Sequence, residues 1–201
     1  MPWTNPQVSQ SRATKKSRQL CAPKRWVPLV AAGAGLLLAP AVATAGPAAK
    51  IAQACPQATQ SSVQSAPSAT LCAVNAVRAD RGLKALKSDA KLANAAQGHA
   101  QAMVSQKVFA HQLPGGATLG QRVQSAGFGK NRRWSAGEVL AWGAGERSTP
   151  AATVQAWLQS PPHKKIILNG RFRKGGVAVV NGVPSGTATG LTYTMNVGWT
   201  K

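Results

Sequence analysis

The chain has 201 residues, enough for one well-cored domain and a targeting segment but too few for two large domains and a leader. It carries 24 Lys and Arg against four Asp and Glu, a formal net charge of +20, so internal ion pairs cannot neutralise it. A surface of this kind favours anionic partners such as nucleic acid, anionic lipid or acidic wall polymers. A solvated basic face without any partner explains the charge equally well. The sequence contains no internal repeat, P-loop, dinucleotide-binding fingerprint or paired-cysteine zinc motif, which disfavours the functions that depend on them.

The amino terminus has the pattern of a secretory signal peptide. Six basic residues and no acid precede an apolar run over 26–42, and Ala43-Thr44-Ala45 follows as a small-residue cleavage site. We therefore expect residues 1–45 to be removed between Ala45 and Gly46, which leaves 18 basic residues against four acidic ones. An uncleaved signal anchor is the alternative, because the apolar run approaches the roughly 20 residues that span a bilayer. Either reading places the domain outside the cytoplasm, as a secreted, periplasmic or envelope protein.

Two of the three cysteines lie outside this leader. Cys21 departs with it, so Cys55 and Cys72 are the thiols of the exported chain. An even number of cysteines in an exported protein predicts a disulfide between them. The alternative is a pair of buried or free thiols.

Helical patterns follow a polar lead-in. Residues 46–68 are rich in Ala, Gln, Ser and Pro and predict an extended segment outside the core, and the domain is expected over 69–201. Apolar spacing predicts a helix that begins at Ala69 and is ended by the glycine of Arg81-Gly82. Spacing and capping residues predict further helices over 90–107 (capped by Ser88 or Asp89) and 119–126, and one that starts at Thr149-Pro150 and stops at Ser160-Pro161-Pro162. The remainder of 108–148 is Gly-rich and predicts long loops.

Two strand patterns close the chain. Residues 176–180 form a short apolar run, and residues 191–200 alternate between apolar and small or polar side chains. The turn-prone residues between them predict an antiparallel hairpin covered by helices, an α+β fold. The expected core residues are Leu71, Leu92, Met103, Val154, Trp157, Val179 and Tyr193.

Few side chains could bind a metal or transfer protons. His99 lies on the apolar stripe of the helix over 90–107, which favours a hydrogen-bonded core histidine over a ligand. His111 opens a Gly-rich loop and His163 follows a double proline, so both are candidate functional residues. Glu138 lies in an otherwise apolar segment, where a buried carboxylate would need a partner. Two imidazoles and a carboxylate would suit a divalent transition metal, although a structural role for each remains open.

Taken in order, several short motifs resemble the CAP superfamily, the cysteine-rich secretory, antigen 5 and pathogenesis-related 1 like proteins, in its bacterial secreted form. The resemblance covers residues 70–199. Its motifs are Asn75-Ala76-Val77-Arg78, Gly82-Leu83, His99-Ala100, Phe109-Ala110-His111, Gly137-Glu138-Val139-Leu140-Ala141, Trp157-Leu158-Gln159-Ser160-Pro161-Pro162-His163-Lys164 and Tyr193-Thr194-Met195-Asn196-Val197-Gly198.

This resemblance implies an α-β-α sandwich, a small and mainly antiparallel sheet with helices on both faces and a cleft at one edge. It also implies that His111, Glu138 and His163 lie at the cleft, where they could bind zinc or another divalent metal. Val139 and Lys164 replace residues usual in the family, and no residue matches the second acid of the eukaryotic branch.

Two functions are compatible with these features. The first is a non-enzymatic extracellular binding domain, a monomer whose cleft holds a metal, lipid, peptide or wall component and whose basic surface contacts anionic envelope surfaces. The second is a metal-assisted hydrolase of envelope peptides or glycans, with His111 and His163 as ligands and Glu138 as ligand or general base. No nucleophile with an orienting base is evident, which favours the first. Specific nucleic-acid binding is not expected.

The leader generates the first prediction. The intact mass of the exported protein should correspond to a chain that begins near Gly46 and has lost two hydrogens to a disulfide. Mass spectrometry before and after reduction measures both. Export of a chain that retains residues 1–45 would contradict the predicted cleavage.

Overall fold

The computed structural model describes residues 46–60, 62–186 and 189–201. The described residues form one compact unit, and the predicted signal peptide lies outside them. Within the described part, no helix is long and apolar enough to cross a membrane.

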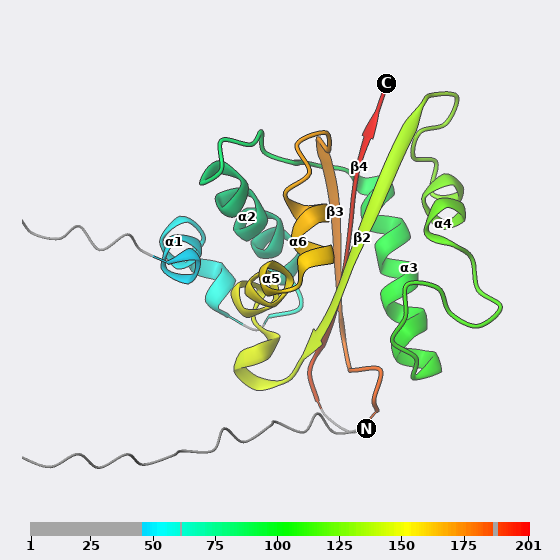
Figure 1. Ribbon diagram of the computed structural model, residues 1–201. Coiled ribbons are helices and arrows are strands. Elements are labelled where there is room, and N and C mark those ends of the chain that lie inside the picture. The colour runs from blue at the N-terminus through cyan, green and yellow to red at the C-terminus, as the bar shows by residue number, and fades with distance from the viewer. Residues whose placement is uncertain (1–45, 61, 187–188) are drawn as a thin grey trace, which may run out of the picture. The chain divides into compact units, whose positions relative to one another are not determined.

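A four-stranded sheet forms the middle layer (Figure 1). It comprises β1 (Lys87–Ser88), β2 (Trp134–Gly143), β3 (Lys174–Asn181) and β4 (Leu191–Thr200), in the order β1-β3-β4-β2. β4 pairs antiparallel with both β3 and β2, and the two-residue β1 pairs parallel with β3. The predicted hairpin is therefore confirmed as β3–β4, and β2 is an edge strand.

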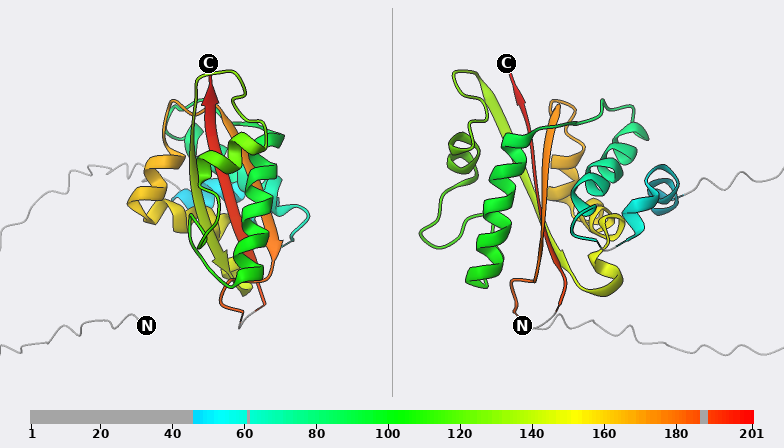
Figure 2. Two further views of the ribbon diagram at one scale, coloured as in Figure 1. Left: turned by 90° about the vertical axis from the view of Figure 1, so that its right-hand side faces the viewer. Right: turned by 180° about the vertical axis from the view of Figure 1, so that it is seen from behind.

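Helices cover both faces of this sheet (Figures 1 and 2). One layer contains α3 (Ala90–Gln106) and α4 (Leu119–Ser125). The other contains α1 (Pro47–Ala54), α2 (Ala66–Ala79), α5 (Pro150–Gln159) and α6 (Pro161–Ile167), with short 3₁₀ turns η1 (Pro56–Thr59) and η2 (Gly145–Ser148). The expected α-β-α sandwich is confirmed.

Side-chain caps explain where several helices begin. Asp89 accepts hydrogen bonds from the backbone N–H groups of Lys91 and Leu92 at the start of α3. Thr149 caps α5 just before its first-turn proline, and Thr118 forms a reciprocal capping box with Gln121 in α4. The caps predicted at Asp89 and Thr149 are thus confirmed.

The larger hydrophobic core lies between the sheet and the layer of α1, α2, α5 and α6. Trp157 is fully buried there and donates a hydrogen bond from its indole Nε1 to the Leu140 carbonyl at 2.8 Å. Tyr193 donates from its hydroxyl to the Ser148 carbonyl at 2.5 Å, and burial raises the pKa of this phenol to about 12. Of the expected core residues, Leu71 is only partly buried and the other six are buried.

A buried arginine ties α2 to the connection between α6 and β3. Arg78 has no exposed surface, and its guanidinium donates to the carbonyls of Lys84, Ile167, Asn169 and Phe172 at 2.6 to 3.2 Å. Burial, with a smaller contribution from Arg173, lowers the pKa of this group. The hydrogen bonds to these carbonyl groups replace the ones that the charged guanidinium would make with water.

The extended lead-in predicted over 46–68 is wrong. This segment contains α1, η1 and the first turn of α2, and it places Ile51, Cys55 and Ala58 in the main core. The error has a physical cause: alanine is the best helix former but carries too little apolar surface to mark a buried face. The Cys55–Cys72 disulfide is confirmed, with a Cα–Cα distance of 6.0 Å.

Further elements were missed, among them β2 and α6. Strand β2 lies within the stretch predicted as loops. It was missed because helices cover both of its faces, so its residues do not alternate between polar and apolar. The helix that starts at Thr149-Pro150 stops at Ser160 as predicted, but Pro161 and Pro162 then begin the unpredicted α6, since a proline in the first turn needs no backbone hydrogen bond.

The buried lead-in generates a stability prediction. Ile51→Ala should lower the free energy of unfolding by about 2–5 kcal/mol, the usual cost of truncating a fully buried aliphatic side chain. Urea denaturation measures this change. Gln53→Ala, an exposed change in the same helix, should alter stability by less than about 0.5 kcal/mol. Similar small effects of both changes would show that α1 does not belong to the core.

Candidate functional site

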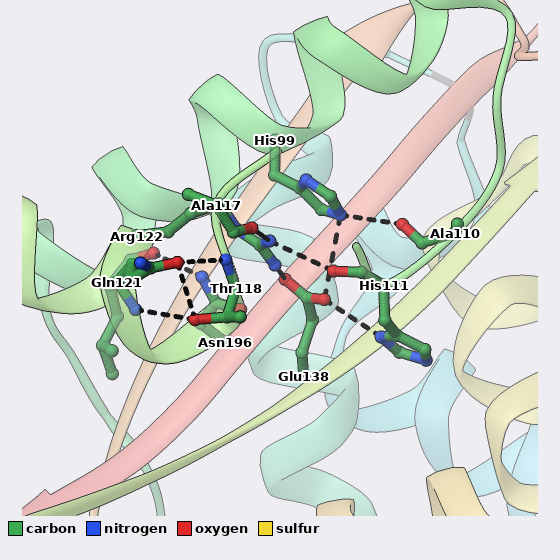
Figure 3. Close-up of polar contacts among 10 residues, drawn as sticks. His99, Ala110, His111, Ala117, Thr118, Gln121, Arg122, Glu138 and Asn196 are labelled. Atoms are coloured by element: carbon green, nitrogen blue, oxygen red, sulfur yellow. Dashed lines mark hydrogen bonds and ion pairs between the residues drawn. The ribbon is translucent and has the colours of Figure 1, made fainter. Parts of the chain in front are cut away.

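Glu138 is the centre of a polar cluster at the β2 edge of the sheet (Figure 3). It faces the α3–α4 layer and its side chain is 2% exposed. Its Oε2 accepts a hydrogen bond from Arg122 of α4 at 2.6 Å, and its Oε1 lies 3.0 Å from Nδ1 of His111. Both carboxylate oxygens are therefore engaged, and the partner that a buried Glu138 requires is Arg122.

Arg122 also fixes the loop that precedes its own helix. One guanidinium nitrogen donates to the carbonyls of His111 at 3.1 Å and Ala117 at 2.8 Å, while another binds Glu138. Its Nε is buried without a hydrogen-bond partner among the described residues. A single side chain thus joins the loop over 111–117 to β2.

The contact with Glu138 orients the ring of His111. A carboxylate only accepts hydrogen bonds, so Nδ1 of His111 carries the proton and Nε2 of the neutral ring is left with its lone pair. This Nε2 has no hydrogen-bond partner in the described part of the chain, and the side chain is 58% exposed. His111 is consequently presented to solvent in a fixed tautomer as a potential ligand or base.

His163 approaches the same edge from the opposite layer. It lies on α6, and its ring centroid is 6.3 Å from that of His111 with an angle of 53° between the ring planes. Burial, and then the proximity of His111, lower the pKa of His163, which favours its neutral form at neutral pH. The structure therefore brings His111 next to both Glu138 and His163, without a direct hydrogen bond between Glu138 and His163 among the described residues.

His99 is a core histidine, as its position in the α3 stripe predicted. It is 2% exposed, and its Nε2 donates to the Ala110 carbonyl at 3.0 Å. The same nitrogen lies 3.9 Å from Glu138. Burial is the main cause that lowers the pKa of His99, although Glu138 opposes it. His99 holds the backbone next to His111 in place.

Among the described residues, no group of three or more His, Cys, Asp and Glu side chains is arranged to hold a metal ion. Arg122 is the residue of this cluster that sequence reasoning missed. A buried Glu138 could be expected to need a cationic partner. Nothing in the position of Arg122 along the sequence, however, distinguishes it from the other basic residues.

The buried Arg122–Glu138 pair generates a prediction. Arg122→Met should lower the free energy of unfolding by about 3–5 kcal/mol, because it leaves a buried carboxylate without its cation. Adding Glu138→Gln to this variant should recover part of the loss, since the amide carries no charge. Urea denaturation compares both with Arg132→Gln, which removes an exposed arginine. An additive effect of the two changes would contradict the coupling.

Comparison with known proteins supports the resemblance found in the motifs. The family model described as "CAP: Cysteine-rich secretory protein family" matches residues 71–196. The uncharacterised protein YkwD of Bacillus subtilis strain 168 is 34% identical over 120 residues, which are 60% of this chain and 44% of YkwD.

Two solved structures share the fold. An extracellular protein containing an SCP domain from Bacillus anthracis strain Ames aligns with a TM-score of 0.57 and 30% identity, over 67% of this chain and 40% of that one. An outer surface protein of Borrelia burgdorferi aligns with a TM-score of 0.54 and 24% identity, over 65% of this chain and 90% of that one. The chain spans less than half the length of the two Bacillus relatives. With the family model covering more than half of its residues, the chain belongs to the cysteine-rich secretory protein (CAP) family.

Proposed function

We propose that this chain is a non-enzymatic extracellular binding domain in which His111 and His163 together hold a divalent transition metal or a small ligand. The observation that carries the proposal is the pairing of a solvent-facing imidazole, oriented by Glu138, with a second imidazole 6.3 Å away between ring centroids. Neutral imidazoles are preferred ligands of zinc, copper and nickel.

Glu138 acts in this proposal as a positioning residue and not as a ligand. Both of its oxygens already have partners, and a carboxylate that accepts from the distal nitrogen of a metal-binding histidine fixes the ring and raises its basicity. The available donors fit a weak site with two protein ligands. A bound zinc would take its remaining positions from water or from a donor atom of a lipid, peptide or wall component.

An extracellular location has three independent supports. Residues 1–45 have the pattern of a signal peptide, and Cys55 and Cys72 form a disulfide of the kind that persists in oxidising compartments. The relative from Bacillus anthracis is described as extracellular.

The alternative, a metal-assisted hydrolase, needs a general base within reach of a bound water. Glu138 was the candidate for that role, but it is almost fully buried and is engaged by Arg122 and His111. These contacts favour binding over catalysis.

Zinc titration tests the proposed site. The protein should bind zinc at about pH 7.5 and lose affinity below about pH 6.5, the ordinary histidine value, because protons compete for the imidazoles. The lowered pKa of His163, caused by burial and then by the proximity of His111, should keep that ligand available as the pH falls. Calorimetry at two pH values measures the change.

Matched variants locate the metal. His111→Ala and His163→Ala should each abolish most of the binding, and Glu138→Gln should weaken it by about 10-fold or more, as expected for a group that orients a ligand. Gln112→Ala, an exposed change beside His111, should leave it unaltered. Zinc uptake by the His111→Ala, His163→Ala double variant equal to that of the unmodified protein would refute the proposal.

A further inference from the structure

A second candidate site lies at the turn between α4 and β2, remote in sequence from both histidines of the first. Two surface hollows of about 490 and 590 Å³ adjoin there and share Phe128, Gly129, Lys130 and Arg132 as lining residues. The two adjoining hollows are together called here the basic groove. It extends from the start of α3 to the first residue of β2.

The basic groove is lined by five cations, Lys91, Lys130, Arg132, Arg133 and Lys174, and by one acid, Asp89. Asp89 is already satisfied, since it caps α3 and forms an ion pair with Lys174 at 3.1 Å. The other four cations form no ion pair with a carboxylate in the described part of the chain.

Three of the four Asp and Glu side chains already have cationic partners of their own. Asp80 is paired with Lys50 and Arg81, Asp89 with Lys174, and Glu138 with Arg122. Only Glu146 is left, in η2, after the far end of β2. Among the described residues, no Asp or Glu side chain pairs with Lys91, Lys130, Arg132 or Arg133, so these four cations are available to an anionic ligand.

The groove has a defined shape as well as a charge. Gly129 has a φ of +71°, and a Cβ at this position would clash with the ring of Trp134. Trp134 also packs edge-on against Phe128, with ring centroids 6.3 Å apart, and Lys174 Nζ lies 5.6 Å from the Phe128 ring centre. These contacts fix the backbone of the turn from which the exposed side chains of Lys130, Arg132 and Arg133 extend.

We propose that the basic groove binds a base-free polymer whose units are joined by phosphodiester bonds, such as a polyol phosphate chain. Guanidinium groups match phosphate oxygens with paired hydrogen bonds, and several cations along one concavity suit a ligand with regularly repeated charge. The choice of an envelope polymer rests on the proposed extracellular function.

Other polyanions fit this groove less well. Single-stranded nucleic acid binds through aromatic faces on which bases stack, but Phe128 is buried and Trp134 packs on Gly129 and Phe128. A lipid surface is flat and would contact exposed apolar side chains, whereas the cations here surround a hollow.

Binding of fluorescent poly(glycerol phosphate) to the full chain tests the proposal, with the same amino terminus in every variant. The variant Lys130→Gln, Arg132→Gln should lose about 10-fold or more in affinity, and the slope of log affinity against log salt should fall by about 2. The control Lys164→Gln, Lys165→Gln removes the same charge from exposed positions of α6 and should change affinity less than about threefold. Equal losses in both variants would show that net charge alone drives binding and would overturn the proposal.

A charge-preserving variant tests the shape of the groove. Gly129→Ala should weaken polymer binding at unchanged net charge, because the new methyl group displaces Trp134. If Gly129→Ala prevents folding, the Lys130→Gln, Arg132→Gln variant alone tests the groove. That variant is expected to fold, since both residues are exposed and outside the core.

Competing ligands test the chemistry. Oligothymidylate and polyglutamate of equal charge should bind more weakly than the polyol phosphate, and equal or tighter binding of either would overturn the assignment. The zinc titration does not depend on the residues of the basic groove. If zinc binds but the polymer does not, the proposed metal site stands and the groove proposal fails. If the polymer binds but zinc does not, the groove proposal stands and the metal site fails.

Discussion

The position of the candidate site follows from the burial of one carboxylate. Taking Glu138 out of water costs several kcal/mol unless its oxygens gain partners of compensating charge or strong donors. Arg122 supplies a charge-assisted hydrogen bond, and the same guanidinium binds two carbonyls of the preceding loop. The loop cannot move away from β2 without exposing that pair. His111 is therefore placed by a requirement of stability before it has any role in binding.

In the opposite helical layer, a buried cation fixes the position of α6. Arg78 is surrounded by carbonyl groups, and the nearest one belongs to Ile167, the last residue of α6. Its other carbonyl partners lie in the connections before β1 and β3, so α2, α6 and the sheet are joined through one guanidinium. His163 stands on α6. Each of the two histidines is thus positioned by a buried charge of its own layer, and the two layers meet at the β2 edge.

Sequence reasoning succeeded where a local signal determines the outcome. Three of these signals act within a few residues: the cap at Asp89, the proline after Thr149 and the alternation over 191–200. The fourth, the pair Cys55 and Cys72, leaves a single choice of disulfide once Cys21 is assigned to the predicted leader. The motifs identified the family and brought His111, Glu138 and His163 to one region. Sequence reasoning failed where burial or strand formation depends on contacts with elements far away in the sequence. Ile51 and Ala58 are buried only because α2 and α5 provide the surfaces they cover, and β2 is recognisable as a strand only beside β4.

Arg122 is the clearest example of information that a single sequence does not contain. The chain offers many cations for one buried carboxylate, and the choice is made by the path of the loop that follows α3. The same contact decides the chemistry of the cluster. Arg122 contacts one oxygen of Glu138 and His111 the other, so the proposed metal site relies on its two imidazoles.

The distribution of charge connects the two candidate sites with stability. Three of the four carboxylates are used inside the domain, to cap α3, to bind Arg122 and to pair with Lys50 and Arg81. The surplus cations repel one another, and this repulsion weakens the folded state most at low ionic strength. A polyanion that binds the basic groove of the folded domain would relieve part of the repulsion and stabilise the fold by mass action. Binding at the groove and stability of the domain are therefore expected to be linked, whereas His111 and His163 are not among the residues that line the groove.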